Sequence, residues 1–95
     1  MTYYFLKEDG KFYLKSKELI LGYIEFVEED KILLINKVFV HESFRGRGIS
    51  NKLMKEIVNI AQHEHKKIKP ICSFAVSWFE KNKKFVCVLE DFNDD

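Results

Sequence analysis

The residue types best suited to chemistry stand together in one short segment, Phe44–Ser50, which reads Phe-Arg-Gly-Arg-Gly-Ile-Ser. An apolar run, Ile32–Val40, precedes this segment, and an amphipathic helical pattern starts at Ile49. Glycine lets the backbone approach a ligand closely, and the first turn of a helix presents unpaired N–H groups and the positive end of its dipole. The segment therefore predicts an anion site, most simply one for phosphate. A strand-to-helix turn that binds nothing is the alternative.

The composition is that of one small domain. The chain has 95 residues, of which 46% are hydrophobic, and a formal net charge of +1. This is enough apolar material for one core, and it lacks the basic excess that is typical of a nucleic-acid-binding protein. We expect a single domain over residues 1–95, whose acidic end, residues 90–95, is frayed.

The cysteines and histidines carry no metal-binding pattern. Cys72 and Cys87 have no metal-ligand spacing, and the start of the chain lacks a basic, apolar leader. His63 and His65 diverge on a helix, because residues two apart do not share a face. No apolar run approaches the roughly 18 residues of a membrane span. We expect a cytoplasmic protein without a metal site or a membrane segment.

The first half of the chain predicts four strands, over residues 3–7, 11–15, 19–28 and 32–41. Asp9-Gly10 between two β-rich runs is a strong hairpin signal. The third and fourth strands are apolar on both faces, which is typical of central strands. Asn36-Lys37 interrupts the fourth strand, which predicts a β-bulge there.

The second half changes to a helical period at Ile49, and the predicted helix runs to about residue 66. A short extended piece is expected at residues 69–72, because the residue before Pro70 avoids helical geometry. Ser73 can cap a second helix, and alternation in residues 84–90 predicts a final strand. The fold class is α/β or α+β, one sheet with two main helices packed on it.

These residues resemble a known family. Arg45-x-x-Gly48-x-Ser50, after a strand and opening a helix, resembles the Arg/Gln-x-x-Gly-x-Gly/Ala signature of the GNAT acetyltransferase superfamily. Pro70-Ile71-Cys72-Ser73-Phe74 and Trp78 resemble a Pro-x-Cys-Ser string of unusually small GNAT-like N-acetyltransferases. The resemblance covers residues 12–89. It implies a mixed, mostly antiparallel sheet and acetyl-CoA as cosubstrate, with coenzyme A held through its pyrophosphate by the backbone N–H groups of the loop.

The resemblance implies cofactor contacts for two segments. The strand before the loop would pair with the pantetheine arm, and a backbone N–H of Phe39 or Val40 would hold the thioester oxygen. A bulge near Asn36 would open the required slot. The expected cofactor-binding residues are Val38, Phe39, Val40, Arg45, Gly46, Arg47, Gly48, Ile49 and Ser50.

The sequence departs from the family pattern in three places. Ser50 replaces the final glycine or alanine of the signature. Only the Glu8-Asp9-Gly10 turn stands where larger members carry one or two helices that wall the acceptor site. The acceptor side is therefore expected to be open, or completed by a partner protein or a second copy. Trp78 and Phe79 occupy the helix that often carries a tyrosine acid, and neither can protonate a leaving thiolate.

Cys72 is the remaining candidate for catalysis. A thiol at a helix N-terminus can act as a nucleophile, forming an acetyl-cysteine, or as a proton donor to the leaving thiolate. A buried core cysteine is the alternative, and Cys87 is expected to lie in the core. For a general base, His41 is preferred over Glu42 and Glu25, because imidazole suits proton abstraction near neutral pH.

The sequence therefore predicts an acetyl-CoA-dependent N-acetyltransferase that acts on a small-molecule or protein amine. A CoA-binding module without catalysis is the first alternative, and a plain interaction domain is the second. Nothing in the sequence ranks the possible amines.

Overall fold

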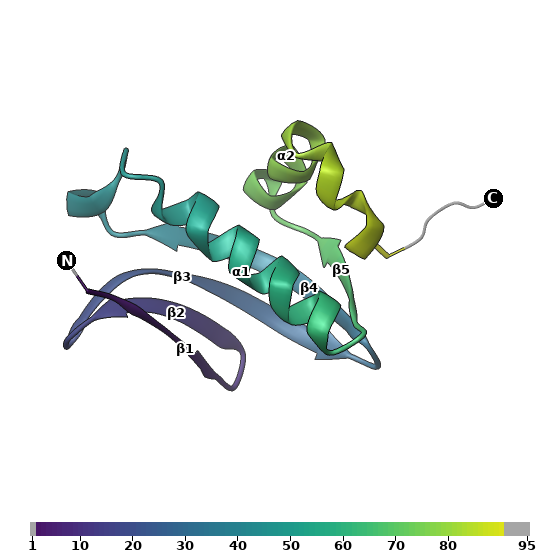
Figure 1. The fold of residues 1–95 in the computed structure, drawn as a ribbon, viewed down its shortest axis with the longest axis horizontal. Coiled ribbons are helices and arrows are strands. Elements are labelled where there is room, and N and C mark those ends of the chain that lie inside the picture. The colour runs from purple at the N-terminus through teal and green to yellow at the C-terminus, as the bar shows by residue number, and fades with distance from the viewer. Residues whose placement is uncertain (1, 91–95) are drawn as a thin grey trace.

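The computed structural model describes residues 2–90 and forms one five-stranded sheet with helices packed on it (Figure 1). The strands, in their spatial order, are β1 (Tyr4–Glu8), β2 (Lys11–Ser16), β3 (Leu19–Glu29), β4 (Ile32–Val40) and β5 (Lys67–Pro70). The helical elements are η1 (Glu42–Phe44), α1 (Ile49–His63), α2 (Ser73–Lys81) and η2 (Lys83–Val88), where η marks a 3-10 helix. The first four strands pair antiparallel and β5 pairs parallel to β4. The predicted mixed, mostly antiparallel sheet with two main helices is confirmed.

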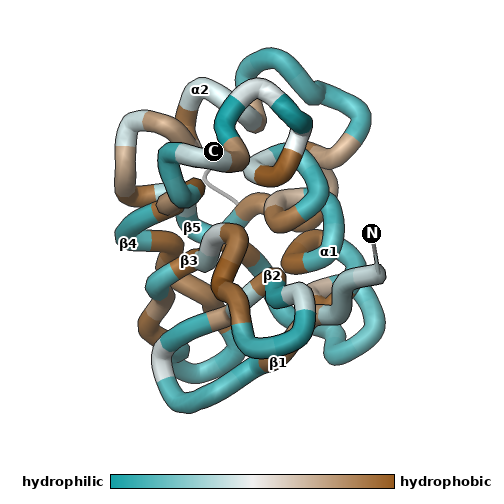
Figure 2. The backbone as a smooth tube through the Cα atoms, turned by 90° about the vertical axis from the view of Figure 1, so that its left-hand side faces the viewer, coloured by the Kyte–Doolittle hydropathy of each residue, from teal (hydrophilic) through white to brown (hydrophobic). Residues whose placement is uncertain are grey.

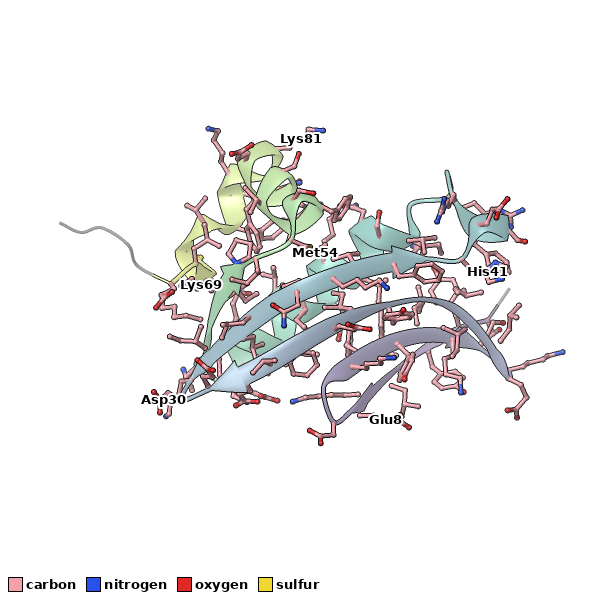
Figure 3. All side chains as sticks on the ribbon, turned by 180° about the vertical axis from the view of Figure 1, so that it is seen from behind. Glu8, Asp30, His41, Met54, Lys69 and Lys81 are labelled. Carbon is pink, nitrogen blue, oxygen red and sulfur yellow. The ribbon has the colours of Figure 1, made fainter. Side chains whose placement is uncertain are left out.

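Helix α1 covers one face of the sheet. Figure 1 shows α1 in front of the strands, and Figure 2 shows it on one side of the sheet only. Its buried residues face β2, β3, β4 and β5, and α2 and η2 add to the same core beside β5. No described helix crosses the opposite face of the sheet, which is seen in Figure 3. The largest fully buried side chains of the core are Leu14, Leu21, Ile24, Leu33, Ile35, Leu53, Met54, Ile57, Ile68 and Val58.

Strands β4 and β5 pair over only part of their length. Their register runs from Ile32 to Ile35, and the N–H groups of Ile71 and Cys72 both donate to the Ile35 carbonyl oxygen, at 2.9 and 3.1 Å. A register shift between Glu25 and Phe26 places an extra β4 residue, Asn36, directly beyond this point. The predicted bulge at Asn36-Lys37 is confirmed. Beyond it β4 continues to Val40 without β5 beside it, which leaves a gap at this edge of the sheet.

The end of the chain differs from the sequence prediction. Residues 84–90 were expected to form a strand, but the structure has η2, followed by a single bridge between Ile68 and Leu89. The difference comes from the edge of β5 that faces away from β4, where a further strand would have to pair. On this edge Ile68 presents its backbone groups, but the next residue to do so is Pro70, which has no N–H to donate. Within the described residues, Ile68 is the one residue of that edge that pairs. Of the acidic tail predicted to be frayed, only Glu90 lies within the described residues.

An ion-pair cluster holds the turn between α1 and β5. Lys66 Nζ lies 2.6 Å from a Glu28 carboxylate oxygen and 2.8 Å from one of Glu64. Both hydrogen bonds raise the pKa of Lys66, and the bond to Glu28 has the larger effect. The hydrogen bond from Lys66 in turn lowers the pKa of Glu64. The cluster fixes the start of β5 against the end of β3. None of the described helices is long and apolar enough to cross a membrane.

Gly22 on β3 lets the first half of α1 approach the sheet. A Cβ at this position would lie 2.6 Å from the Phe39 carbonyl oxygen, 3.2 Å from Leu53 Cδ1 and 3.3 Å from Ile49 Cγ2. We expect Gly22→Ala to lower the free energy of unfolding by about 1–3 kcal/mol, as overpacking does. Urea denaturation measures this change. Val27→Ala, at an exposed position of the same strand, is the control and should stay within about 0.5 kcal/mol. An unchanged midpoint for Gly22→Ala would contradict the close contact.

Candidate functional site

A pocket of about 320 Å³ lies where α1 begins, beside the part of β4 that β5 does not cover. Its walls come from the end of β4, from η1 and the loop after it, from the first residues of α1 and from α2. The lining residues are Val38, Phe39, Val40, Phe44, Arg45, Gly46, Gly48, Ile49, Ser50 and Phe74. The structure therefore brings all the sequence-predicted cofactor residues except Arg47 to one pocket. Phe44 and Phe74 also line it; Phe74 is 40% exposed, and the only signal for it was its place in the string after Cys72.

The loop before α1 has the geometry of an anion cradle. Gly46 and Gly48 have φ of 80° and 76°, and a Cβ on either would meet no atom within 4 Å. Gly48 is the N-cap of α1, and no side chain caps the helix there. The first helical hydrogen bond runs from Lys52 N–H to the Gly48 carbonyl oxygen, at 3.0 Å. Within the described residues, the N–H groups of residues 49–51 therefore have no acceptor. Together with the positive end of the helix dipole, they form a site that favours an anion.

The two arginines of the loop have different surroundings. Arg45 Nε donates to the Val40 carbonyl oxygen at 3.0 Å, which ties the loop to the end of β4. Arg47 is exposed, with its Cζ 5.7 Å from the centre of the Phe44 ring. Arg45 thus shapes the loop and lines the pocket, whereas Arg47 lies outside the pocket lining with its guanidinium exposed beside it.

The backbone register decides which N–H groups face the gap beside β4. The His41 N–H donates to the Leu21 carbonyl oxygen at 2.8 Å, so His41 points its backbone groups toward β3. In an antiparallel pair alternate residues point to the same neighbour, so Phe39 also faces β3 and Val38 and Val40 face the gap. The bond from Arg45 to the Val40 carbonyl agrees with this direction. The sequence offered the backbone N–H of Phe39 or Val40 as the donor to the thioester oxygen. The Phe39 N–H points toward β3 and away from the gap, whereas the Val40 N–H points into the gap.

Cys72 stands where β4 and β5 separate. It is the N-cap of α2, in place of the predicted Ser73, and its sulfur accepts the Ala75 N–H at 3.4 Å. Its own N–H donates to the Ile35 carbonyl oxygen at the end of the paired stretch. The side chain is half-buried and packs against the core. A thiol that faces the gap and a packed helix cap are both consistent with this position.

His41 lies far from Cys72. It is exposed, and its Nδ1 accepts the Ser43 N–H at 3.1 Å as the cap of η1. Figure 3 shows His41 at the opposite end of β4 from Lys69 of β5. Because an extended chain rises about 3.3 Å per residue, His41 and the Ile35 carbonyl that holds Cys72 are separated by roughly 15–20 Å. The two side chains cannot act on the same atom.

None of the other candidate side chains lines the pocket. Glu42 is exposed in η1, and Glu25 faces Lys11 with 3.7 Å between the carboxylate oxygen and Nζ. Cys87 was predicted to lie in the core but is exposed, because its segment is η2 and not a strand. Trp78 Nε1 donates to Asn51 Oδ1 at 2.9 Å, which holds α2 against the first turn of α1. No group of three potential metal-ligating side chains occurs among residues 2–90.

Comparison with known proteins places this geometry in a family. The sequence matches the family model of GCN5-related N-acetyl-transferases over residues 11–88. The chain belongs to this family. Its structure is similar to the solution structure of a GCN5-like protein from Staphylococcus aureus, with a TM-score of 0.76 and 25% identity over 95% of this chain and 90% of that one. No curated protein sequence matches this GCN5-related chain significantly.

Larger family structures share the fold with this GCN5-related chain at low identity. The ribosomal-protein-S18-alanine N-acetyltransferase of Escherichia coli has a TM-score of 0.64 and 10% identity over 82% of this chain and 51% of that one. The PaiA N-acetyltransferase of Thermoplasma acidophilum, solved with coenzyme A, has a TM-score of 0.62 and 14% identity over 76% and 48%. The chain thus spans about half the length of these two relatives.

Proposed function

We propose that the protein is a cytoplasmic, acetyl-CoA-dependent N-acetyltransferase that transfers an acetyl group to an amine. One observation carries the proposal: the uncapped N-terminus of α1 opens onto a pocket that continues along the unpaired edge of β4. Membership of the GCN5-related family and the presence of coenzyme A in the PaiA structure support it. Acetyl-CoA would supply the activated acetyl group.

The residues of the pocket fit coenzyme A in two places. The N–H groups at the start of α1 would hold the pyrophosphate, and the open space in front of Gly48 leaves room for it. The outward N–H groups of Val38 and Val40 would pair with the pantetheine arm. The Val38 N–H is our candidate for polarising the thioester oxygen, because Val40 lies nearly as far along β4 from Cys72 as His41 does. Ser50 lines the same pocket, and its hydroxyl can add a hydrogen bond to phosphate.

Cys72 has two possible parts in the transfer. As a nucleophile, the Cys72 thiol would give up its proton and its sulfur would attack the acetyl carbon to form an acetyl-cysteine. The bond between the acetyl group and the sulfur of coenzyme A would break, and the proton would go to the departing thiolate. The amine would then attack this acetyl group, and its released proton would restore the Cys72 thiol. As a general acid, Cys72 would only donate its proton to the departing thiolate while the amine attacks directly, and the proton that the amine then releases would restore the thiol. The position at the start of α2, beside the gap, suits both roles.

A non-catalytic CoA-binding module is the competing proposal. The position of His41 favours it, because the histidine caps η1 and lies too far away to serve as a base at Cys72. Trp78 and Phe79 are buried and can supply no proton at the gap either.

An acetyl-transfer assay with a panel of amines distinguishes the proposals. Acetyl-CoA is mixed with the protein and a peptide amine, a polyamine or an amino acid, and free thiol and acetylated product are both measured. We expect acetylated product in proportion to released thiol for at least one amine. Acetyl-CoA binding without any product would favour the non-catalytic module, and the absence of binding would contradict both proposals.

Replacing Arg47 tests the contribution of charge to the cradle. We expect Arg47→Ala to weaken acetyl-CoA binding by about three- to tenfold at low salt, because an exposed cation contributes a screened attraction to the pyrophosphate. The difference from the wild type should shrink near 0.5 M salt, where screening acts over about 4 Å or less. Calorimetric titration at two salt concentrations measures it. Lys55→Ala, on the exposed side of α1, is the control, and equal losses in both variants would argue against a specific contact.

A further inference from the structure

The helix-free face of the sheet carries a row of aromatic rings that ends at the pocket. Tyr23 lies between Tyr13 and Phe39, with ring centroids 6.0 and 5.1 Å apart. Phe39 lines the pocket together with Val38 and Val40. Neighbouring residues on a strand point to opposite faces, so the pocket borders side chains from both faces of the sheet. The pocket therefore lies at the edge of the sheet, next to the helix-free face.

An unpaired positive charge stands beside this aromatic row, close to the pocket residue Phe39. Lys37 Nζ lies 5.9 Å from the ring centroid of Phe39 and 5.9 Å from that of Tyr23. Glu25 is opposite Lys37 in the register, but its carboxylate is engaged with Lys11, 3.7 Å away. Within the described residues Lys37 has no carboxylate within 4.0 Å. Lys69 of β5 is exposed and pairs with Leu34 of β4, and it adds a second positive charge along the same edge.

The shape of this face suits an extended ligand. No described helix crosses it, so a small amine would remain mostly in water, whereas small-ligand sites bury most of their ligand. An extended peptide can lie across the strands and cover the exposed rings. Its carboxylates would meet Lys37, whereas the same ammonium group would repel a polyamine.

We infer that the acceptor is an amine within an acidic peptide segment, which docks on the helix-free face with a carboxylate at Lys37. This inference rests on the proposed acetyl transfer. It adds the substrate class, because Lys37 and the aromatic row would select the sequence around the amine.

Peptide titration followed by amide NMR shifts tests the docking without any turnover. The probes are a short peptide with one lysine flanked by glutamates, its glutamine-flanked and lysine-flanked analogues, and spermidine. We expect the glutamate-flanked peptide to shift the amides of Tyr23, Lys37 and Phe39, and to bind about tenfold more tightly than the lysine-flanked peptide at low salt. Equal affinities, shifts confined to other residues, or tighter binding of spermidine would overturn the inference.

Two charge-reversal variants make the test specific. Lys37→Glu should invert the preference between the two charged peptides, whereas Lys55→Glu, the same change on the exposed side of α1, should leave it unchanged. An unchanged preference in Lys37→Glu would overturn the assignment of Lys37. The turnover assay with the same peptides should follow the binding order. Acetyl-CoA binding together with an absence of peptide preference contradicts this inference alone, whereas an absence of acetyl-CoA binding contradicts the proposed function as well.

Discussion

Replacing Gly48 with alanine is expected to weaken acetyl-CoA binding by about a hundredfold or more. The new Cβ would occupy the open space in front of the first turn of α1, where the pyrophosphate is proposed to lie. Charge-assisted hydrogen bonds contribute roughly 1.5–3 kcal/mol each, so the loss of two of them accounts for a change of this size. Calorimetric titration with acetyl-CoA measures it.

The hairpin glycine Gly10 provides a matched control for this variant. Its φ of 78° is close to the 76° of Gly48, and an added Cβ there would make only an ordinary contact, 3.7 Å from the Phe26 carbonyl oxygen. Alanine at either position adopts a left-handed conformation at a cost of about 1–2 kcal/mol. We therefore expect Gly10→Ala and Gly48→Ala to lose similar stability, but only Gly48→Ala to lose binding. Retained affinity in Gly48→Ala, or equal loss in Gly10→Ala, would contradict the proposed cradle.

Replacing Cys72 with alanine is expected to reduce acetyl transfer by about 10²–10⁴-fold, the usual contribution of a positioned proton donor. Acetyl-CoA affinity should change little, because Cys72 is not among the residues that line the pocket. The Ala75 N–H would lose its acceptor at the start of α2, so a modest loss of stability is also expected. Thiol release and product mass measure the transfer, and calorimetry measures the affinity.

Two further variants separate chemistry from capping. Cys72→Ser keeps a cap acceptor but has a much poorer nucleophile, so it should retain stability and lose transfer. Cys87→Ala, at the exposed cysteine, should retain both. Accumulation of a protein heavier by one acetyl group, in the wild type but not in Cys72→Ser, would identify the nucleophilic role. Full transfer in Cys72→Ala would remove Cys72 from the mechanism.

The elements that the sequence predicted well are those with strong local signals. Asp9-Gly10 determines a two-residue hairpin, and the change of hydrophobic period at Ile49 marks the start of α1. The polar pair Asn36-Lys37 in an otherwise apolar strand correctly predicted the bulge. In each case the responsible residues lie within a few positions of the feature that they produce.

The features that the sequence did not predict depend on distant neighbours. Alternation at residues 84–90 suited a strand, but Pro70 on β5 leaves too few backbone groups for one to pair with. The same error placed Cys87 in the core. Whether Phe39 or Val40 faces the gap depends on the register against β3, and the exclusion of His41 depends on where β5 ends beside β4. Neither can be read from residue types along the chain.

Titration of the labelled protein with acetyl-CoA, followed by amide NMR shifts, tests the proposed site most directly. A chain of 95 residues is well suited to it. We expect the largest shifts at the amides of residues 47–51, where the pyrophosphate would lie, and at Val38 and Val40, beside the pantetheine arm. The hairpin of β1 and β2 should remain unshifted. An absence of shifts at submillimolar acetyl-CoA, or shifts that leave out the start of α1, would contradict the proposed acetyl-CoA site.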